Sequence, residues 1–432
     1  MTRTALRRAA WLLAPLAAMA LALPSAAGAA ERPPRPDAGA WVLVDAEDGE
    51  RLAGRSISSE RSIASATKLM TAYVALRELP LRRRLAAPDY QPSSPLESLA
   101  GLAPGERMSV RDLLYALLLP SANDAAVTLA EGVSGSVPKF VREMNKTAAA
   151  LGLTGTEYEN PIGLDSARNH STAADLAALT LRLRRQPIFR RIVDTPSAVL
   201  RTGSRTRQVT NRNTLLRVPW VNGVKTGHTL DAGYVLVGSG TRKGTTLVSV
   251  VLGAPGEAAR DEGTLELLEY GFSLYRRETA VPAGKAIASP NLEYQGTTLP
   301  LVAERELRVS VRRGQQVETS VSAPGEVEGP IDRGEKLGKV TVSVDGRDAG
   351  SVALVSARAA DEATFLERAR ARLPGPAALI AIGAGVILIG VIAARRAASR
   401  DGRGPEERTP RHEERMRRNE QEPVREREGE RS

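Results

Sequence analysis

The first half of the chain combines short apolar runs with longer stretches in which apolar residues recur at helical spacing. Residues 40–45 form an apolar, β-prone run, and a polar turn and a returning strand are expected to follow it. From Ser65 onward the apolar positions repeat every three or four residues, which is the period of an amphipathic helix. Further helices are expected at 110–119, 123–131, 172–184 and 263–276, and strands at 234–238 and 245–252. Because helices are inserted between strands, the pattern predicts a mixed α/β domain.

The pattern changes after Glu278, where short β-prone runs alternate with glycine, proline and Asp-Gly turns. The runs span 307–311, 339–344 and 351–355, and the dipeptide at 345–346 has the sequence of a tight hairpin turn. We therefore expect a small all-β domain here, followed by a charged helix over 359–373.

Two apolar segments lie near the ends of the chain. A short basic stretch, the apolar run 9–23 and small residues up to Ala30 follow one another in the order of a cleavable secretory signal. A retained N-terminal anchor is the alternative. The run 377–394 carries no charge and is just long enough to span a bilayer. Arg395 and Arg396 follow it directly, which favours a cytoplasmic location for the residues beyond.

These patterns divide the chain into six predicted segments. They are a signal peptide at 1–30, the α/β domain at 31–277, the small β domain at 278–356, a charged helical stalk at 357–374, a transmembrane helix at 375–394 and an Arg/Glu-rich tail at 395–432. The tail mixes charges of both signs with little apolar content, so we expect it to be disordered.

Composition excludes several kinds of chemistry. The 432 residues include no cysteine, which rules out a thiol nucleophile, a disulfide framework and a thiolate metal site. His170, His228 and His412 are the three histidines and have no ligand spacing, so we expect no metal and no cofactor. The formal charge of +10 raises the question of nucleic acid. However, glutamates are interleaved with the arginines of the tail and no aromatic residues accompany them, so we expect no nucleic-acid partner.

Ser65 and Lys68 stand three residues apart at the start of the first long predicted helix. On a helix this spacing places a hydroxyl and an amine on the same face. A serine needs a neighbouring base to take its proton, and a lysine can be that base only where its neutral form is favoured. A second Ser-x-x-Lys begins at Ser136 and contains Pro138. We interpret it as a chance match, because we expect no long amphipathic helix to begin there.

Ser121 and Asn123 follow Pro120, which is expected to end one helix and start the next. Residues on such a connection can offer a hydroxyl and an amide to a cleft. Taken alone, Ser121 is better explained as a helix N-cap. A second Ser-x-Asn, at 289–291, lies outside the α/β domain and is set aside.

Lys225, Thr226 and Gly227 stand just before the strands of a predicted hairpin. A strand that borders a cleft can present a cation and a hydroxyl to a substrate carboxylate. The glycine is expected to leave room for a substrate backbone alongside the strand.

In this order, Ser-x-x-Lys, Ser-x-Asn and Lys-Thr-Gly resemble the active-site motifs of penicillin-binding proteins and serine β-lactamases. The flanking residues are similar to those of low-molecular-mass penicillin-binding proteins, the D-alanyl-D-alanine carboxypeptidase family. The similar segments are 65–73, 121–125, 160–165, 170–172, 211–213, 225–229 and 232–234. The resemblance covers roughly 41–272, and more faintly the β domain. It implies a mixed α/β, β-lactamase/transpeptidase-like catalytic domain, a small all-β domain and one C-terminal transmembrane helix.

The resemblance also implies catalytic roles. Ser65 would be acylated by a peptidoglycan stem peptide that ends in D-Ala-D-Ala, with release of the last D-alanine. Lys68 would be the general base, and Ser121 would relay the proton to the leaving amine. β-Lactam antibiotics would be covalent inhibitors of the same serine.

A further set of residues would bind the substrate. Asn123 would hold the substrate amide, Arg260 would recognise the terminal carboxylate, and the backbone N–H groups of Ser65 and His228 would form the oxyanion hole. The residues expected to bind substrate are Asn123, Lys225, Thr226, Gly227, His228 and Arg260. The expected location is the bacterial cell membrane, crossed once, with the catalytic domain on the extracytoplasmic side.

Three alternatives remain open at this point. A β-lactamase needs an extra carboxylate to activate water, and the sequence identifies none. A D,D-endopeptidase would use the same site on a related bond. An inert penicillin-binding scaffold is opposed by the intact Ser65, Lys68, Ser121 and Lys225.

Overall fold

The computed structural model describes residues 32–372 and 376–398. The predicted signal peptide and nearly all of the predicted tail lie outside the described residues. The chain divides into two compact units. Of the described residues, one unit comprises 32–287, Val302–Ser322 and Gly338–Leu354, and the other comprises Ala288–Leu301, Ala323–Leu337 and those from Val355 onward.

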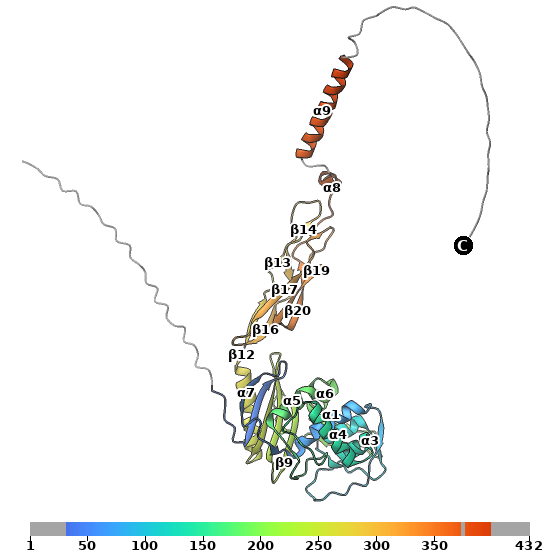
Figure 1. The fold of residues 1–432 in the computed structure, drawn as a ribbon, viewed down its shortest axis with the longest axis vertical. Coiled ribbons are helices and arrows are strands. Elements are labelled where there is room, and N and C mark those ends of the chain that lie inside the picture. The colour runs from blue at the N-terminus through green and yellow to red at the C-terminus, as the bar shows by residue number, and fades with distance from the viewer. Residues whose placement is uncertain (1–31, 373–375, 399–432) are drawn as a thin grey trace, which may run out of the picture. The chain divides into compact units, whose positions relative to one another are not determined.

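A five-stranded antiparallel sheet forms the centre of the first unit (Figure 1). Its strand order is β2 (Arg51–Arg55), β1 (Ala40–Asp45), β11 (Thr245–Ala254), β10 (Gly233–Arg242) and β9 (Val221–Thr229). Strand β1 pairs with β11, so the start of the domain lies beside its end. Strand β9 is an edge strand and carries the predicted Lys225-Thr226-Gly227 segment.

Side chains on both faces of this sheet are buried, and alternation along β1 assigns them to two cores. Val42 and Val44 pack into the larger core with the helices between β2 and β9, whereas Trp41 and Leu43 pack into a smaller core with Leu267 of α7 (Glu257–Ser273). Successive strand residues point to opposite faces, which explains why all six residues of β1 are buried. The sheet is therefore covered by helices on each face (Figure 1).

The helical region lies in the chain between β2 and β9. Its helices are η1 (Ala64–Thr67), α1 (Lys68–Glu78), α2 (Val110–Leu118), α3 (Asn123–Ser134), α4 (Val137–Ala150), α5 (Ala173–Arg184), α6 (Pro187–Val193) and η2 (Thr214–Arg217). Its short strands pair as β3 (Arg61–Ser62) with β6 (His170–Ser171), β4 (Arg84–Ala86) with β5 (Arg107–Ser109), and β7 (Ser197–Leu200) with β8 (Arg207–Thr210). The expected mixed α/β fold is confirmed.

Two helix predictions were wrong in detail. A 14-residue amphipathic helix, α4, does begin after Ser136. Pro138 lies in its first turn, where the backbone N–H has no helical partner to lose, so proline does not break it. Helix α7 starts at Glu257, six residues before its predicted start, because its first turns are polar and carry no apolar period.

The expected all-β region is also confirmed. Strand β12 (Tyr275–Val281) pairs with β16 (Leu307–Arg312), and β14 (Asn291–Leu292) pairs with β18 (Glu326–Val327). A second five-stranded sheet has the order β13 (Ala286–Ala288), β15 (Leu301–Ala303), β20 (Arg347–Ser356), β19 (Lys336–Val344) and β17 (Val317–Ser322). Asp345 and Gly346 both have positive φ, at 49° and 75°, as a tight hairpin turn between β19 and β20 requires.

Two helices follow the β region. Helix α8 (Phe365–Arg372) is shorter than predicted and begins after Thr364, which caps it: Thr364 Oγ1 accepts from the Glu367 N–H, and the Glu367 carboxylate accepts from the Thr364 N–H. Helix α9 (Pro376–Ala398) contains Ile380–Ala397, a stretch long and apolar enough to cross a membrane. This agrees with the predicted single C-terminal span.

Candidate active site

Ser65 and Lys68 lie where the 3₁₀ helix η1 passes into α1. Lys68 Nζ donates to Ser65 Oγ over 3.1 Å and to the Ile162 carbonyl oxygen over 2.6 Å. The Lys68 side chain is fully buried. These two hydrogen bonds hold the Lys68 amine next to the Ser65 hydroxyl.

The surroundings of Lys68 favour its neutral form. Burial lowers its pKa well below the ordinary value, and the charges of Lys225 and Arg212 lower it further, while Glu97 and Asp124 act in the opposite direction. A neutral amine has a free lone pair, so Lys68 can accept the proton that Ser65 must lose when its oxygen attacks a carbonyl.

Two glycines allow other segments to approach the nucleophile closely. A Cβ on Gly163, whose φ is +90°, would lie 2.0 Å from the Ala64 carbonyl oxygen and 2.9 Å from Ser65 N. A Cβ on Gly227 would lie 3.0 Å from Ser65 N. The missing side chain of Gly227 leaves room for the backbone of residues 63–65, and Gly227 also lines the cavity, so room for a substrate backbone stays a prediction.

Ser121 and Asn123 face the same cleft from the connection between α2 and α3. Ser121 has a φ of 68°, uncommon for a residue other than glycine, and its buried Oγ has no hydrogen-bond partner in the part of the chain that is described. Asn123 begins α3 and donates from Nδ2 to Glu97 Oε2 over 2.7 Å. An unpartnered hydroxyl is free to accept or donate a proton during a reaction.

Strand β9 supplies the opposite wall. Lys225 is buried and donates to the Thr226 carbonyl oxygen over 2.8 Å. Burial, reinforced by the charges of Arg212 and Arg260, lowers its pKa to about 7. The His228 ring is exposed and stacks on Tyr234, with ring centroids 4.1 Å apart. The imidazole thus has an aromatic partner, and the proposed contribution of the His228 backbone N–H stays a prediction.

Arg260 lies on α7 with only 4% of its side chain exposed. Its guanidinium contacts Glu257 at 2.8 Å and Asp261 at 2.7 Å and lies 6.0 Å from the Tyr234 ring centroid. A buried guanidinium at the cleft wall is suited to bind a carboxylate. A substrate carboxylate would share this guanidinium with Glu257 and Asp261.

These elements enclose a cavity of about 490 Å³. Ser65, Ser121, Asn123, Thr226, Gly227, His228 and Arg260 all line it, together with Glu97, Arg212, Leu164 and other residues. Lys68 and Lys225 are not on its surface and lie buried behind it. The structure thus brings together all nine predicted site residues, seven at the cavity and two behind it.

The sequence reading assigned no role to two contributors. Asn160 Oδ1 accepts from the Gly163 N–H over 2.6 Å and so shapes the turn whose Ile162 carbonyl holds Lys68. The segment 160–165 was noted only for its family resemblance. Glu97 was missed entirely, because a lone glutamate in a polar loop carries no pattern.

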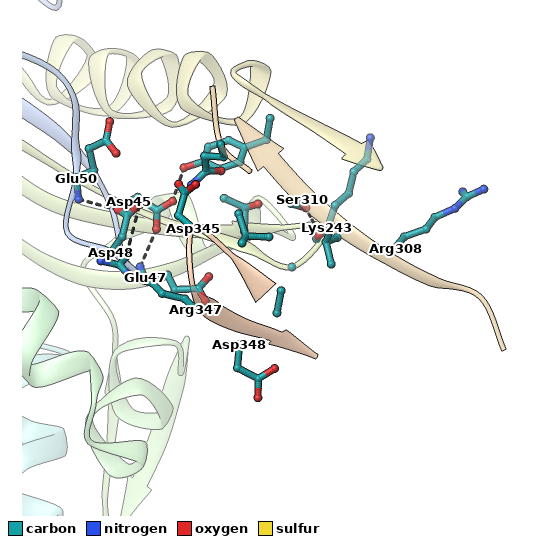
Figure 2. Close-up of a pocket in the computed structure, with 17 residues that line it drawn as sticks. Asp45, Glu47, Asp48, Glu50, Lys243, Arg308, Ser310, Asp345, Arg347 and Asp348 are labelled. Carbon is teal, nitrogen blue, oxygen red and sulfur yellow. Dashed lines mark hydrogen bonds and ion pairs between the residues drawn. The ribbon is translucent and has the colours of Figure 1, made fainter. Parts of the chain in front are cut away.

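A second cavity, of about 450 Å³, lies next to the turn between β1 and β2 (Figure 2). It is lined by both acidic and basic side chains, and its carboxylates are taken up by ion pairs and local hydrogen bonds: Asp48 and Glu50, for example, both pair with Arg312. Asp45 accepts from the Glu47 N–H and Asp48 from the Glu50 N–H, each over 2.7 Å. Within residues 32–372 and 376–398, no three His, Asp or Glu side chains are grouped so as to hold a metal ion.

A serine paired with a buried lysine, on the floor of a cleft with cationic side chains, defines an enzyme that works through a serine acyl intermediate. Comparison with known proteins identifies the class. The family profile of D-alanyl-D-alanine carboxypeptidases matches residues 27–256, and that of the penicillin-binding protein 5 C-terminal domain matches residues 275–362. The chain belongs to the D-alanyl-D-alanine carboxypeptidase family.

Relatives and solved structures agree with this assignment. The chain is 36% identical to D-alanyl-D-alanine carboxypeptidase DacD of Salmonella typhimurium, over 67% of this chain and 77% of the relative. It is 32% identical to DacA of Haemophilus influenzae, over 74% and 85%. Penicillin binding protein 5 from Haemophilus influenzae covers 77% of this chain and 99% of its own, with a TM-score of 0.55 and 30% identity. The Streptomyces K15 DD-transpeptidase covers 56% and 100%, with a TM-score of 0.54 and 33% identity.

These findings confirm the predicted family, fold class and enzyme class. The protein is a serine-type D-Ala-D-Ala carboxypeptidase of the penicillin-binding type, and it functions in the bacterial cell wall.

Proposed function

We propose that Ser65 is the residue acylated by the stem peptide and by β-lactams, with Lys68 as its base. The observation that carries this assignment is the 3.1 Å contact between Lys68 Nζ and Ser65 Oγ, made by an amine whose pKa is lowered by burial. Lys68 takes the hydroxyl proton while Oγ bonds to the carbonyl carbon of the penultimate D-alanine. The backbone N–H groups of Ser65 and His228 stabilise the oxyanion that forms.

Ser121 then passes the proton to the nitrogen of the leaving D-alanine as the peptide bond breaks. Its buried and unpartnered Oγ supports this role, since it has no competing hydrogen bond among the described residues. Water subsequently hydrolyses the Ser65 ester and releases the shortened stem peptide. Asn123 binds the substrate amide, while Lys225, Thr226, Gly227 and Arg260 bind around its terminal carboxylate.

The carboxylates at the cleft favour a carboxypeptidase over a β-lactamase. Glu97 and Glu257 are the two that line the described cleft. Glu257 pairs with Arg260, and both oxygens of Glu97 accept hydrogen bonds from protein donors. Neither is left free to activate water for rapid hydrolysis of a penicilloyl ester.

The membrane arrangement is proposed in the same way. A signal peptide at 1–30 directs export, the catalytic domain spans 31–277, and the β domain at 278–356 with the stalk at 357–374 precedes a membrane helix at 375–394. The apolar stretch Ile380–Ala397 and the arginines at 395 and 396 support one crossing, with the tail beyond it in the cytoplasm. The catalytic domain then faces the wall.

Incubation of the exported protein with a pentapeptide that ends in D-Ala-D-Ala tests the activity. We expect free D-alanine in step with loss of the pentapeptide, and covalent labelling of one Ser65-containing peptide by fluorescent penicillin. Labelling without D-alanine release would refute the carboxypeptidase assignment and favour a scaffold or an endopeptidase.

A further inference from the structure

Glu97 occupies a place in the cleft that no motif explains. It lies in the loop between β4 and β5, is half-buried, and lines the cavity beside Ser98 and Asn123. Its Oε2 accepts from Asn123 Nδ2 over 2.7 Å and from the Tyr90 hydroxyl. Its Oε1 accepts from both the backbone N–H and the hydroxyl of Ser93, each over 2.7 Å.

These four donors keep Glu97 ionised. Burial alone would raise its pKa, but the hydrogen bonds from Tyr90, Asn123 and Ser93 together lower it to about 2. Burial and the contact with Glu97 raise the pKa of Tyr90, so this phenol remains a donor. At neutral pH the Glu97 carboxylate is therefore always the acceptor and the Tyr90 hydroxyl always the donor.

An ionised carboxylate only accepts hydrogen bonds, and this fixes the orientation of the Asn123 amide. The edge of the amide that faces Glu97 must be the NH₂ group. The amide oxygen is then turned away from Glu97, and the residue lines the cleft. Without a charged acceptor, the two flipped orientations of an asparagine amide differ little in shape, and nothing in the contact itself would select one of them.

Glu97 is not the only group that holds the loop in position. Asp124, next to Asn123 in the chain, accepts from the Ala100 N–H over 2.9 Å and from the Leu102 N–H over 3.0 Å. The Asn123 N–H donates to the Ser98 carbonyl oxygen over 2.7 Å. Three hydrogen bonds other than those of Glu97 thus hold the loop against the start of α3.

We propose that Glu97 is a positioning residue, which orients the Asn123 amide toward the substrate by accepting its Nδ2–H. The inference rests on the proposed role of Asn123 in binding the substrate amide. Glu97 does not act as a base in this scheme, because its acceptor positions are already used.

The charge of Glu97 also acts on Lys68. Lys68 faces Lys225 and Arg212, which lower its pKa, and Glu97 and Asp124, which raise it. Conversion of Glu97 to glutamine removes one of the two opposing negative charges. The pKa of Lys68 then falls further, so the acid limb of the acylation rate moves to lower pH.

The experiment measures the rate of acylation by fluorescent penicillin from pH 5 to 9 for the full chain and its variants. Glu97→Gln keeps the shape of the side chain but removes its charge. Asp89→Asn is the matched control, since Asp89 is an exposed carboxylate of the same loop that does not line the cavity. Asn123→Ala and the double variant Glu97→Gln/Asn123→Ala complete a double-mutant cycle.

We expect the plateau rate of Glu97→Gln to fall about tenfold, the loss typical of one misplaced hydrogen bond to a charged group. Its acid limb should lie at lower pH than that of the wild type, and Asp89→Asn should show neither change. In the double variant the plateau should be no lower than in Asn123→Ala alone, because Glu97 acts through Asn123.

Three results would overturn the inference: an unchanged plateau in Glu97→Gln, plateau losses that multiply in the double variant, or normal acylation with a trapped acyl-enzyme. The last would make Glu97 a hydrolytic base. Labelling that persists in Ser65→Ala is a different failure, because it removes the proposed function and not only the role of Glu97.

Discussion

Replacement of Gly163 by alanine tests how tightly the nucleophile is held. The new Cβ would lie 2.0 Å from the Ala64 carbonyl oxygen, 2.5 Å from its carbonyl carbon and 2.9 Å from Ser65 N. All three are backbone atoms and cannot rotate away. Gly163 also has a φ of +90°, a conformation that alanine adopts only with strain.

The magnitude divides into two parts that a control can separate. The positive φ costs about 1 kcal/mol once the lower entropy of the unfolded alanine chain is counted. Gly135 has a φ of +76° with no atom within 4 Å of its Cβ position, so Gly135→Ala shows this part alone. Overpacking against backbone adds about 1–3 kcal/mol. Gly163→Ala should therefore lower the free energy of unfolding by about 2–4 kcal/mol.

Urea unfolding followed by tryptophan fluorescence measures these values in the right domain, because Trp41 and Trp220 both belong to it. Penicillin labelling measures the consequence at the site. If the clash displaces the Ser65 N–H from the oxyanion, acylation should slow about 100-fold. Gly135→Ala should label at the wild-type rate. Equal stability and equal labelling of the two variants would refute the close packing of Gly163 on the nucleophile.

Three further outcomes are expected. Ser65→Ala should abolish penicillin labelling and Ser136→Ala should leave it intact, which gel fluorescence of both variants would measure. Labelling lost only in Ser136→Ala would reverse the choice of motif. Between about pH 7 and the ordinary lysine pKa of 10.5, Lys225 binds fewer protons in the folded state than in the unfolded state. The free energy of unfolding should therefore rise with pH in this window, and this rise should be smaller in Lys225→Met. Urea midpoints at pH 7 and 9 measure that slope, and equal slopes in the two proteins would exclude a depressed pKa at Lys225. Truncation before Ala377 should give a soluble, penicillin-labelled protein after cell fractionation, and continued membrane association would contradict anchoring by α9.

Much of the fold could be predicted because its signals are periodic. Strand β1 and helix α5 were placed to within a residue or so, since alternating burial and apolar spacing mark them directly. Helix α4 was not predicted, although its proline, Pro138, lies in the first turn, where proline is tolerated. The start of α7 was missed because its first two turns are charged and their partners are set by tertiary contacts.

The candidate site could be predicted as a set of residue types but not as an arrangement. Ser65 and Lys68 are one helical turn apart, so their contact follows from local geometry. The contact of Lys68 with the Ile162 carbonyl, 94 residues away, depends on the packing of a loop against α1. Glu97 and Asn123 likewise meet only because the loop is hydrogen-bonded to the start of α3.

The electrostatics of the cleft arise from this long-range packing. Lys68, Lys225, Arg212 and Arg260 come from four separate segments, and their mutual repulsion depresses the pKa of both lysines beyond what burial alone does. Binding of a carboxylate in such a cleft is favourable, because the anion offsets the repulsion among the cations. The same anion raises the pKa of nearby lysines, so a bound substrate favours protonated Lys225 while Lys68 must stay neutral to act as a base.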